Sequence, residues 1–337
     1  MKHLRKFSSV SAMETAIANA KVSFVGLAYD NGEPVLNITV PAPPPDPSIP
    51  FYINVRGAVT LAATSKLQMS TDGETWTNTT STTLPTGKTY FRVATDQTTP
   101  LRPKWTEDSN SDYDIGGNIN SLVKVNFAND INCYRFFDDQ YSMTFFQDKT
   151  KLKSAGDLIL PATTLTDNCY AELFSGCTSL TTAPALPATT LTSWCYYKMF
   201  SNCRALTAAP ALPATTLASR CYYQMFTGCW GLTTAPALPA TTLAEYCYYG
   251  MFNYCNSLTT APALPATTLV AQCYNTMFSN CTQLNDITIY ANDITASGCL
   301  AYWLQSVAST GTFHNLGSAV YSSGESGIPN GWTEVHS

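Results

Sequence analysis

Residues 195–217 of this 337-residue chain read CYYKMFSNCRALTAAPALPATTL, and close copies of the stretch recur along the C-terminal half of the sequence. The hexapeptide LPATTL begins at five positions that follow one another at a constant step of 26 residues: Leu160, Leu186, Leu212, Leu238 and Leu264. No insertion or deletion interrupts this central register. A constant step predicts identical structural units that stack along one axis, each contacting only its neighbours.

The first half of one unit has the pattern of a short amphipathic helix. Thr192 or Ser193 can cap its start, because a hydroxyl side chain accepts hydrogen bonds from the free backbone N–H groups there. The residues that then recur at helical spacing are Cys195, Tyr196, Met199, Phe200 and Cys203. Their period is near 3.6 residues, so they are expected to share one buried face of a helix.

The second half of the unit, residues 206–212, predicts a short extended segment, because Pro210 disfavours a helix. Its Leu206, Ala209 and Ala211 match the inward positions of a leucine-rich repeat, L-x-x-L-x-L, with Ala in place of Leu. The predicted fold class is therefore a mixed α/β solenoid of leucine-rich repeats in 26-residue coils. An all-strand β-helix fits less well, because the Cys-Tyr-Tyr-x-Met-Phe segment has the helical period rather than a period of two.

Both ends of the repeat region contain residues typical of caps. Before the first full unit, Lys149 stands where Cys177 stands in the next unit, so a charge replaces a predicted buried thiol. A terminal coil has only one neighbour, and its outer face should therefore be polar. The repeat decays after Leu284, and the residues expected to close the last coil are Trp303, Leu304, Phe313 and Trp332.

The chain has twelve cysteines, most of them in two ladders that keep the 26-residue step, with Cys133 and Cys299 outside or at the edge. Zinc ligands usually come as cysteines two to four residues apart, whereas the two ladders are eight residues apart with no histidine nearby. Disulfides within or between coils remain an alternative. We favour buried free thiols, which suit a chain that folds in a reducing cytoplasm, and we predict no metal and no cofactor.

The N-terminal half is predicted to contain two small parts. A capping-box pattern at residues 11–14 predicts a short helix, and residues 21–29 and 33–40 predict a hairpin. A β-rich domain follows, for which a β-sandwich is the best description. Its predicted strands span 51–55, 67–70, 75–78 and 89–94. The predicted domains are an N-terminal attachment module at 1–40, a Pro-rich linker at 41–50, the β-rich domain at 51–132, the solenoid at 133–290 and a C-terminal cap at 291–337.

Composition argues against several classes of protein. A net charge of −5 opposes general nucleic-acid binding, which needs a basic face that displaces counterions. No run of about 18 apolar residues is present, so no membrane span is predicted. The basic start at residues 1–6 resembles that of a signal peptide, but polar residues interrupt the stretch that should be apolar. We therefore expect a chain that is not exported by a signal of its own.

The sequence offers little that could carry catalysis. Its three histidines, His3, His314 and His336, lie near the termini or the predicted cap, which argues against a histidine-based triad. The acidic residues of the repeat region lie far apart in the coil register, which argues against a glycosidase. Residues 108–114 resemble a calcium loop but lack its glycine and its final glutamate, so a polar surface loop is the favoured interpretation. No catalytic residue is predicted, and the chain is predicted not to be an enzyme.

Variation among the units is more informative, because most positions repeat almost letter for letter. The residue before the first cysteine varies and includes Trp194, Arg220 and Tyr246. The pair after the second cysteine also varies and includes Arg204 and Trp230. Exposed Trp, Tyr and Arg dominate binding hot spots, so these five residues are the candidate ligand-binding positions. The alternative is that they are unconstrained loop positions. A further row, Tyr197, Tyr223 and Tyr249, is expected to stack as a structural ladder.

The repeat unit resembles the BspA-like leucine-rich repeats of surface proteins from gut anaerobes, on the strength of residues 145–300. The segments 69–76 and 117–122 look like the β-domain that precedes such repeats, and residues 327–332 look like their usual close. The opening MKHLRKF is similar to the start of virion proteins in crAss-like and related tailed phages. Together these resemblances imply a phage structural protein that carries a bacterial-type adhesion module. They supply no catalytic residues.

The predicted function is accordingly that of a non-catalytic virion protein, a fibre, tail or capsid-decoration component. Its solenoid would adhere to a bacterial surface glycan or protein, and residues 1–40 would bind other virion proteins. We expect a homo-oligomer in the particle, made in the host cytoplasm, with no nucleic-acid or membrane partner. Two alternatives stay open: a purely structural virion component, and a leucine-rich-repeat adhesin on a bacterial cell surface.

Overall fold

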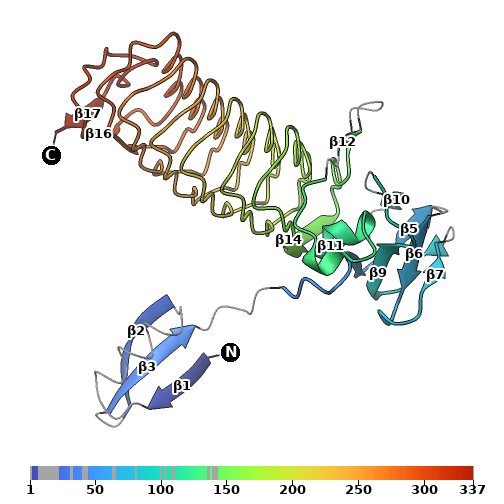
Figure 1. The fold of residues 1–337 in the computed structure, drawn as a ribbon. Coiled ribbons are helices and arrows are strands. Elements are labelled where there is room, and N and C mark those ends of the chain that lie inside the picture. The colour runs from blue at the N-terminus through green and yellow to red at the C-terminus, as the bar shows by residue number, and fades with distance from the viewer. Residues whose placement is uncertain are drawn as a thin grey trace. The chain divides into compact units, whose positions relative to one another are not determined.

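In the computed structural model the chain forms two compact units, Met1–Pro45 and Asp46–Ser337. The described residues are 2–6, 23–30, 33–39, 45–62, 66–79, 82–98, 101, 104–107, 111–134, 137–138 and 143–336. Figure 1 shows the stacked coils of the repeat region within the second unit. None of the helices in the described part of the chain is long and apolar enough to span a membrane.

The first unit contains a three-stranded antiparallel sheet in the order β1-β3-β2. Its strands are β1 (Lys2–Lys6), β2 (Ser23–Asp30) and β3 (Glu33–Thr39). The hairpin predicted from residues 21–29 and 33–40 is confirmed, because β2 and β3 pair antiparallel. The pairing of β1 with β3 was not predicted. The short helix expected near residues 11–20 lies outside the described residues.

The second unit begins with two sheets. The larger sheet has the order β14-β11-β4-β9-β6-β7, and the smaller one has the order β10-β5-β8. The strands of the larger sheet are β14 (Leu152–Ile159), β11 (Tyr113–Asn118), β4 (Tyr52–Val55), β9 (Gly87–Val93), β6 (Leu67–Ser70) and β7 (Thr77–Asn78). The smaller sheet contains β10 (Lys104–Glu107), β5 (Val59–Ala62) and β8 (Thr82–Thr83). Shorter elements nearby are the 3₁₀ helices η1 (Ile119–Leu122) and η2 (Phe127–Asn129) and the strand pair β12 (Phe137–Asp138) and β13 (Met143–Thr144).

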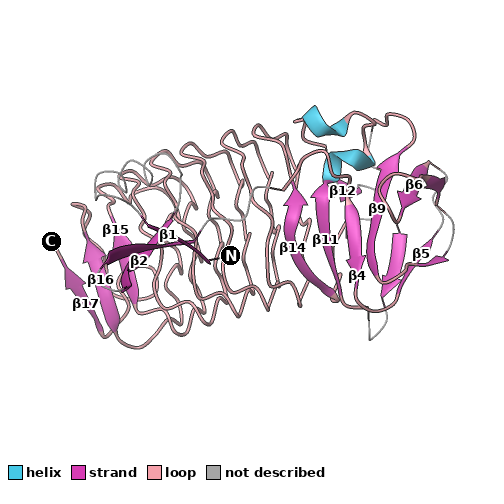
Figure 2. Ribbon diagram, turned by 90° about the horizontal axis from the view of Figure 1, so that it is seen from below, coloured by secondary structure: helices cyan, strands magenta, loops and turns pink. Residues whose placement is uncertain are grey.

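One apolar core joins the β-rich part to the coils. The ring of Phe51 lies 5.8 Å from that of Phe145 and 5.9 Å from that of Phe146, measured between centroids. Phe146 in turn stacks on Phe174 of the first full coil at 5.3 Å. The sheet makes the same connection, since β11 pairs in parallel with β14 at the start of the coil stack (Figure 2). The solenoid therefore grows directly from the edge of the larger sheet.

The predicted α/β leucine-rich-repeat fold is wrong. In the described part of the chain there is no α-helix, and each Cys-Tyr-Tyr-x-Met-Phe segment is a series of consecutive turns. Every fourth residue of the series has a left-handed backbone; in one coil these are Trp194, Lys198 and Asn202, with φ of 61°, 49° and 60°. The molecule is thus a β-rich, nearly helix-free stack of coils.

Backbone hydrogen bonds explain why a turn series replaces the helix. The N–H of Tyr197 donates to the carbonyl of Trp194 in its own coil at 3.1 Å, as in a turn. The N–H of Tyr196 instead donates to Cys221 of the next coil at 3.0 Å, and the N–H of Lys198 donates to Tyr223 at 2.9 Å. Alternate donors therefore need the neighbouring coil, and buried backbone groups left without a partner would be costly. A single unit cannot satisfy itself, but a stack can.

The second half of each unit also differs from the leucine-rich-repeat pattern. Leu206 is fully buried as expected, but Ala209 is only partly buried and Ala211 is exposed. The residues that turn inward there are Leu212, Ala214 and Leu217. Proline leaves too few N–H donors for a continuous strand, and neighbouring coils pair only through isolated parallel bridges such as Thr216 with Thr242.

The two ends of the coil stack are closed in different ways. At the C-terminal end, Trp303, Leu304, Phe313 and Trp332 are buried, as predicted. The parallel sheet there comprises β15 (Asp286–Ile289), β16 (Gly311–Asn315) and β17 (Trp332–Val335). Phe313 and Trp332 belong to its strands β16 and β17, and Trp303 packs against Phe313. At the N-terminal end the expected polar outer face is wrong, because Phe51 and strand β11 of the β-rich part pack against the first coil. Lys149 there donates from Nζ to the carbonyl of Trp105 at 3.1 Å.

Candidate functional site

Ten of the twelve cysteines are free and buried, which confirms the predicted thiol ladders for those ten. In the second ladder each thiol donates to the phenylalanine carbonyl of the preceding coil, for example from Cys203 Sγ to Phe174 O at 3.1 Å and from Cys229 Sγ to Phe200 O at 3.1 Å. Burial raises the pKa of the Cys229 thiol to about 12. These thiols are therefore protonated at neutral pH and join coils rather than act as nucleophiles.

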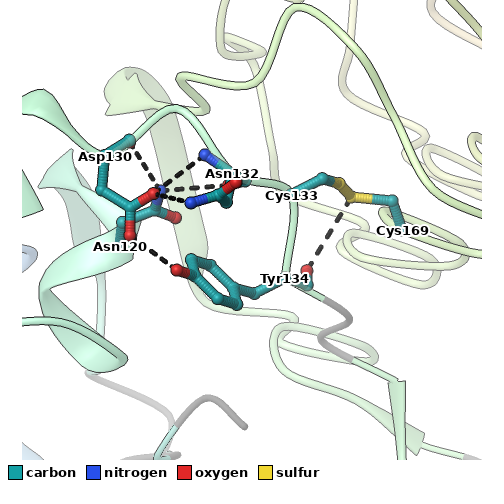
Figure 3. The surroundings of a disulfide bond; sticks show 6 residues. All are labelled: Asn120, Asp130, Asn132, Cys133, Tyr134 and Cys169. Atoms are coloured by element: carbon teal, nitrogen blue, oxygen red, sulfur yellow. Dashed lines mark hydrogen bonds between the residues drawn. A yellow bond between two sulfur atoms is a disulfide. The ribbon is translucent and has the colours of Figure 1, made fainter. Parts of the chain in front are cut away.

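The remaining pair, Cys133 and Cys169, forms a disulfide, so the prediction of twelve free thiols is wrong for these two. Figure 3 shows the hydrogen bonds that hold the segment before Cys133. The Asp130 carboxylate accepts from Asn132 Nδ2 and from the Tyr134 hydroxyl, both at 2.6 Å. The disulfide therefore fastens an ordered loop of the β-rich part to the start of the first cysteine ladder.

Within the described residues, no group of three or more His, Cys, Asp or Glu side chains is arranged to hold a metal ion. Open grooves on the surface of the coils are lined by alanine and proline, as between Ala183–Pro187 and Pro210–Pro213. These grooves offer apolar contact but few side-chain donors or acceptors. The chemistry that could select a ligand lies on the turn segments instead.

Three of the five candidate binding residues come together on successive coils. Trp194, Arg220 and Tyr246 are each the left-handed residue that opens a turn segment, with φ of 61°, 58° and 57°. The constant coil register places them in one row. Three tyrosines lie beside this row, and we name the six residues the aromatic strip: Trp194, Tyr197, Arg220, Tyr223, Tyr246 and Tyr249.

The centre of the aromatic strip is an arginine between two rings. The guanidinium carbon of Arg220 lies 4.2 Å from the ring centroid of Tyr246 and 5.0 Å from that of Trp194. Cation–π attraction favours this arrangement. All three side chains are partly buried rather than fully exposed, which corrects the expectation that they project freely into solvent.

The predicted stacking of the tyrosine row is confirmed for Tyr223 and Tyr249, whereas the ring of Tyr197 is tilted by 37° relative to that of Tyr223. The rings of Tyr223 and Tyr249 lie 4.6 Å apart and nearly parallel, and those of Tyr197 and Tyr223 lie 5.5 Å apart. The tyrosines also contact the neighbouring row of Trp194, Arg220 and Tyr246, since Trp194 packs edge-on against Tyr197 at 5.0 Å. Burial and the neighbouring tyrosines raise the pKa of Tyr223 to about 12, so this hydroxyl is neutral at physiological pH.

The charge of the aromatic strip is positive although the chain is acidic overall. Arg220 donates from Nη1 to Ser219 Oγ at 3.2 Å. It forms no ion pair with any carboxylate in the described part of the chain. A second cation, Lys198, lies 4.9 Å from the ring centroid of Tyr197. Lys198 was not among the candidate residues predicted from the sequence. Its place four residues after Trp194 would indicate it only if the four-residue period of the turn segment were already known.

The other two candidates, Arg204 and Trp230, form a separate pair after the turn segments. The Arg204 guanidinium carbon lies 4.2 Å from the Trp230 ring centroid. The Trp230 side chain is 45% exposed, more than any residue of the aromatic strip. A single pair offers less contact area than the six residues of the strip, so the strip is the stronger candidate site.

No protein-family model, no curated protein and no solved structure matches the chain. The class of protein is therefore defined by its own fold and surface. It is a repeat protein of stacked 26-residue coils with a β-rich part at one end and a partly buried aromatic and cationic strip on its turn segments.

Proposed function

We propose that the chain is a non-catalytic binding protein whose aromatic strip adheres to a bacterial surface glycan or protein. The observation that carries the proposal is the row of Trp194, Arg220 and Tyr246 on three successive coils. Tryptophan, tyrosine and arginine are the residues that most often dominate binding energy, and they are enriched at the centre of interfaces. The strip itself contains no histidine and no carboxylate, so its chemistry supports binding rather than acid–base catalysis.

We further propose that the protein is a virion component, a fibre, tail or capsid-decoration protein that is attached through residues 1–40. The likeness of the opening residues to virion proteins of tailed phages supports this placement, as does the likeness of the repeat unit to bacterial surface adhesins. Residues 1–45 form a compact unit of their own, which supports a separate attachment role for this part of the chain. Oligomerisation in the particle would also multiply a weak glycan contact.

The test is adhesion to a panel of intact gut anaerobes. We expect the double variant Trp194→Gln, Tyr246→Gln to lose about 2–4 kcal/mol of binding free energy, roughly a 30- to 1,000-fold weaker Kd. Glutamine suits this row, because Gln272 occupies the equivalent position with φ of 60°. Tyr302→Gln is the matched control, since Tyr302 is also left-handed and 53% exposed but lies outside the strip.

The outcome distinguishes adhesion from a purely structural role. Binding that is lost in the double variant but kept in the control supports the aromatic strip as the adhesion surface. A modest fall in melting temperature is expected in the double variant, because each ring contact contributes about 1 kcal/mol. Unchanged binding by a folded double variant would eliminate the strip and favour the purely structural virion component.

A further inference from the structure

We infer that the ligand of the aromatic strip is an anionic glycan whose carboxylate or phosphate group binds to Arg220, an inference that rests on the proposed adhesive function. The first observation is the position of the Arg220 guanidinium between two aromatic rings. Trp194 and Tyr246 lie against the group from the coils before and after it, at 5.0 and 4.2 Å. A guanidinium that lies over aromatic rings keeps N–H donors that can form hydrogen bonds with other groups.

The second observation is that, among the residues that the structure describes, the N–H groups of Arg220 have few acceptors. A guanidinium carries five N–H donors, and the protein acceptor found for them is Ser219 Oγ. The nearest acidic residue along the next coil is Glu245, and it forms no ion pair with Arg220 in the described structure. The chain has 23 acidic residues against 18 basic ones, so an unpaired arginine is not explained by a shortage of carboxylates.

An arginine held between two rings is preorganised to bind an anion that has two oxygen atoms, such as a carboxylate or a phosphate. Carboxylate and phosphate groups accept two parallel hydrogen bonds from one guanidinium, and such bonds are stronger than those between neutral groups. The rings on both sides restrict the side chain, so little conformational freedom is lost on binding. Lys198 lies beside Tyr197 at one end of the strip, but Glu172 of the preceding coil interacts with it, so Arg220 is the charge on which the inference rests.

The aromatic residues indicate that the anion belongs to a sugar chain. Aromatic side chains pack well against apolar C–H surfaces, and the strip places partly exposed aromatic residues on adjacent coils. Coils about 4.8 Å apart would place Trp194 and Tyr246 roughly 10 Å apart, about the length of two sugar rings. The row turns polar on both sides, with Asn168 in the preceding coil and Gln272 in the following one. A ligand of two or three sugars therefore fits, whereas a protein partner normally buries about 800 Å² on each side.

The experiment uses the full-length protein and the bacterial cells that it binds. Cells are treated in four ways: with protease, with carbodiimide and an amine to neutralise carboxylates, with hydrofluoric acid to remove phosphates, and with buffer alone. We expect binding to survive protease and to fall at least tenfold after one of the two chemical treatments, which identifies carboxylate or phosphate as the anion. Loss after protease, or full binding after both chemical treatments, would overturn the inference.

Arg220→Gln supplies the second arm, because the row already accepts glutamine at position 272. On untreated cells we expect this variant to bind at least tenfold more weakly than the parent. On cells whose anion has been neutralised, the variant and the parent should bind alike, as a double-mutant cycle requires of two interacting groups. A variant that binds untreated cells as tightly as the parent refutes the anionic ligand while leaving adhesion through Trp194 and Tyr246 standing. Failure of the Trp194, Tyr246 double variant to lose binding refutes the aromatic strip as the adhesion surface, which is the proposed function on which this inference rests.

Discussion

Left-handed residues at every fourth position decide the conformation of each turn segment. The rows include glycine and asparagine, which adopt this backbone readily, but also larger residues such as Tyr254 with φ of 60°. A left-handed backbone costs most residues with a Cβ roughly 1–2 kcal/mol, whereas glycine avoids this cost. The stack therefore stores strain at these positions, and the hydrogen bonds between coils hold it in place.

Tyr254 offers a test of that strain, because its side chain is 48% exposed and Gly228 occupies the same position one coil earlier. We expect Tyr254→Gly to raise the free energy of unfolding by up to about 1 kcal/mol, since it relieves the backbone and removes little packing. Tyr254→Val should lower it by about 1 kcal/mol or more, because a β-branched residue disfavours a positive φ. Urea denaturation of the three proteins measures both changes. A glycine variant less stable than the parent would contradict the strain argument.

The buried residues of the turn segment could be predicted from the sequence, but its conformation could not. Cys195, Tyr196, Met199, Phe200 and Cys203 are all buried, as the apolar pattern indicated. Over nine residues a period of 4.0 is hardly distinguishable from one of 3.6, so the pattern fitted a helix equally well. A further signal was the recurrence of asparagine or glycine at one position of the unit, as in Asn202, Gly228 and Asn280, which is visible only when the units are compared. The hydrogen bonds that favour the turn series over a helix join different coils, so they leave no pattern within the sequence of a single unit.

At the scale of single elements, the disulfide is the feature that spacing could not reveal. Cys133 lies outside the 26-residue register and 36 residues before Cys169, and pairing cannot be deduced from sequence alone. Cys169 itself is the first member of a ladder whose later members are free. The expectation of a chain that folds in a reducing cytoplasm accounts for the ten free thiols but not for this bridge.

Counting thiols tests this pairing. We expect ten of the twelve cysteines to react in the denatured, unreduced protein, and all twelve after reduction. In the native protein at pH 8 few should react, because burial raises the pKa of thiols such as Cys281 to about 12. Removing the bridge in Cys133→Ser should lower the free energy of unfolding by at most about 4 kcal/mol, the loop-closure value for a loop of this length. Twelve reactive thiols without a reductant would show that the bridge is absent.

For the whole molecule, the sequence predicted the repeat, its length and the residues that close its C-terminal end. It did not predict that the β-rich part and the solenoid share one core, because the strands that join them, β11 and β14, lie far apart in the sequence. The row of Trp194, Arg220 and Tyr246 was foreseen from variability at one position of the unit. Its arrangement as an arginine between two rings required the coil register and the backbone geometry.

The boundary between the two units provides the last prediction. Residues 46–50 belong to the second unit, since Asn118 Nδ2 donates to the carbonyl of Pro47 at 3.2 Å and the N–H of Asn118 donates to Ile49 O at 2.8 Å. A truncated protein that begins at Asp46 keeps these contacts, whereas one that begins at Phe51 loses them. We expect the Asp46 protein to melt as the parent does and the Phe51 protein to melt several degrees lower, because Asn118 is fully buried and would lose an acceptor.

The same pair of truncations separates folding from attachment. If residues 1–40 bind other virion proteins, the Asp46 protein will bind cells normally but will fail to join the particle in a complementation experiment. Both properties are measured on one sample, by cell adhesion and by the protein content of purified particles. Normal incorporation of the Asp46 protein would show that attachment lies in the second unit, and reduced adhesion of the isolated protein would show that the first unit contributes to ligand binding.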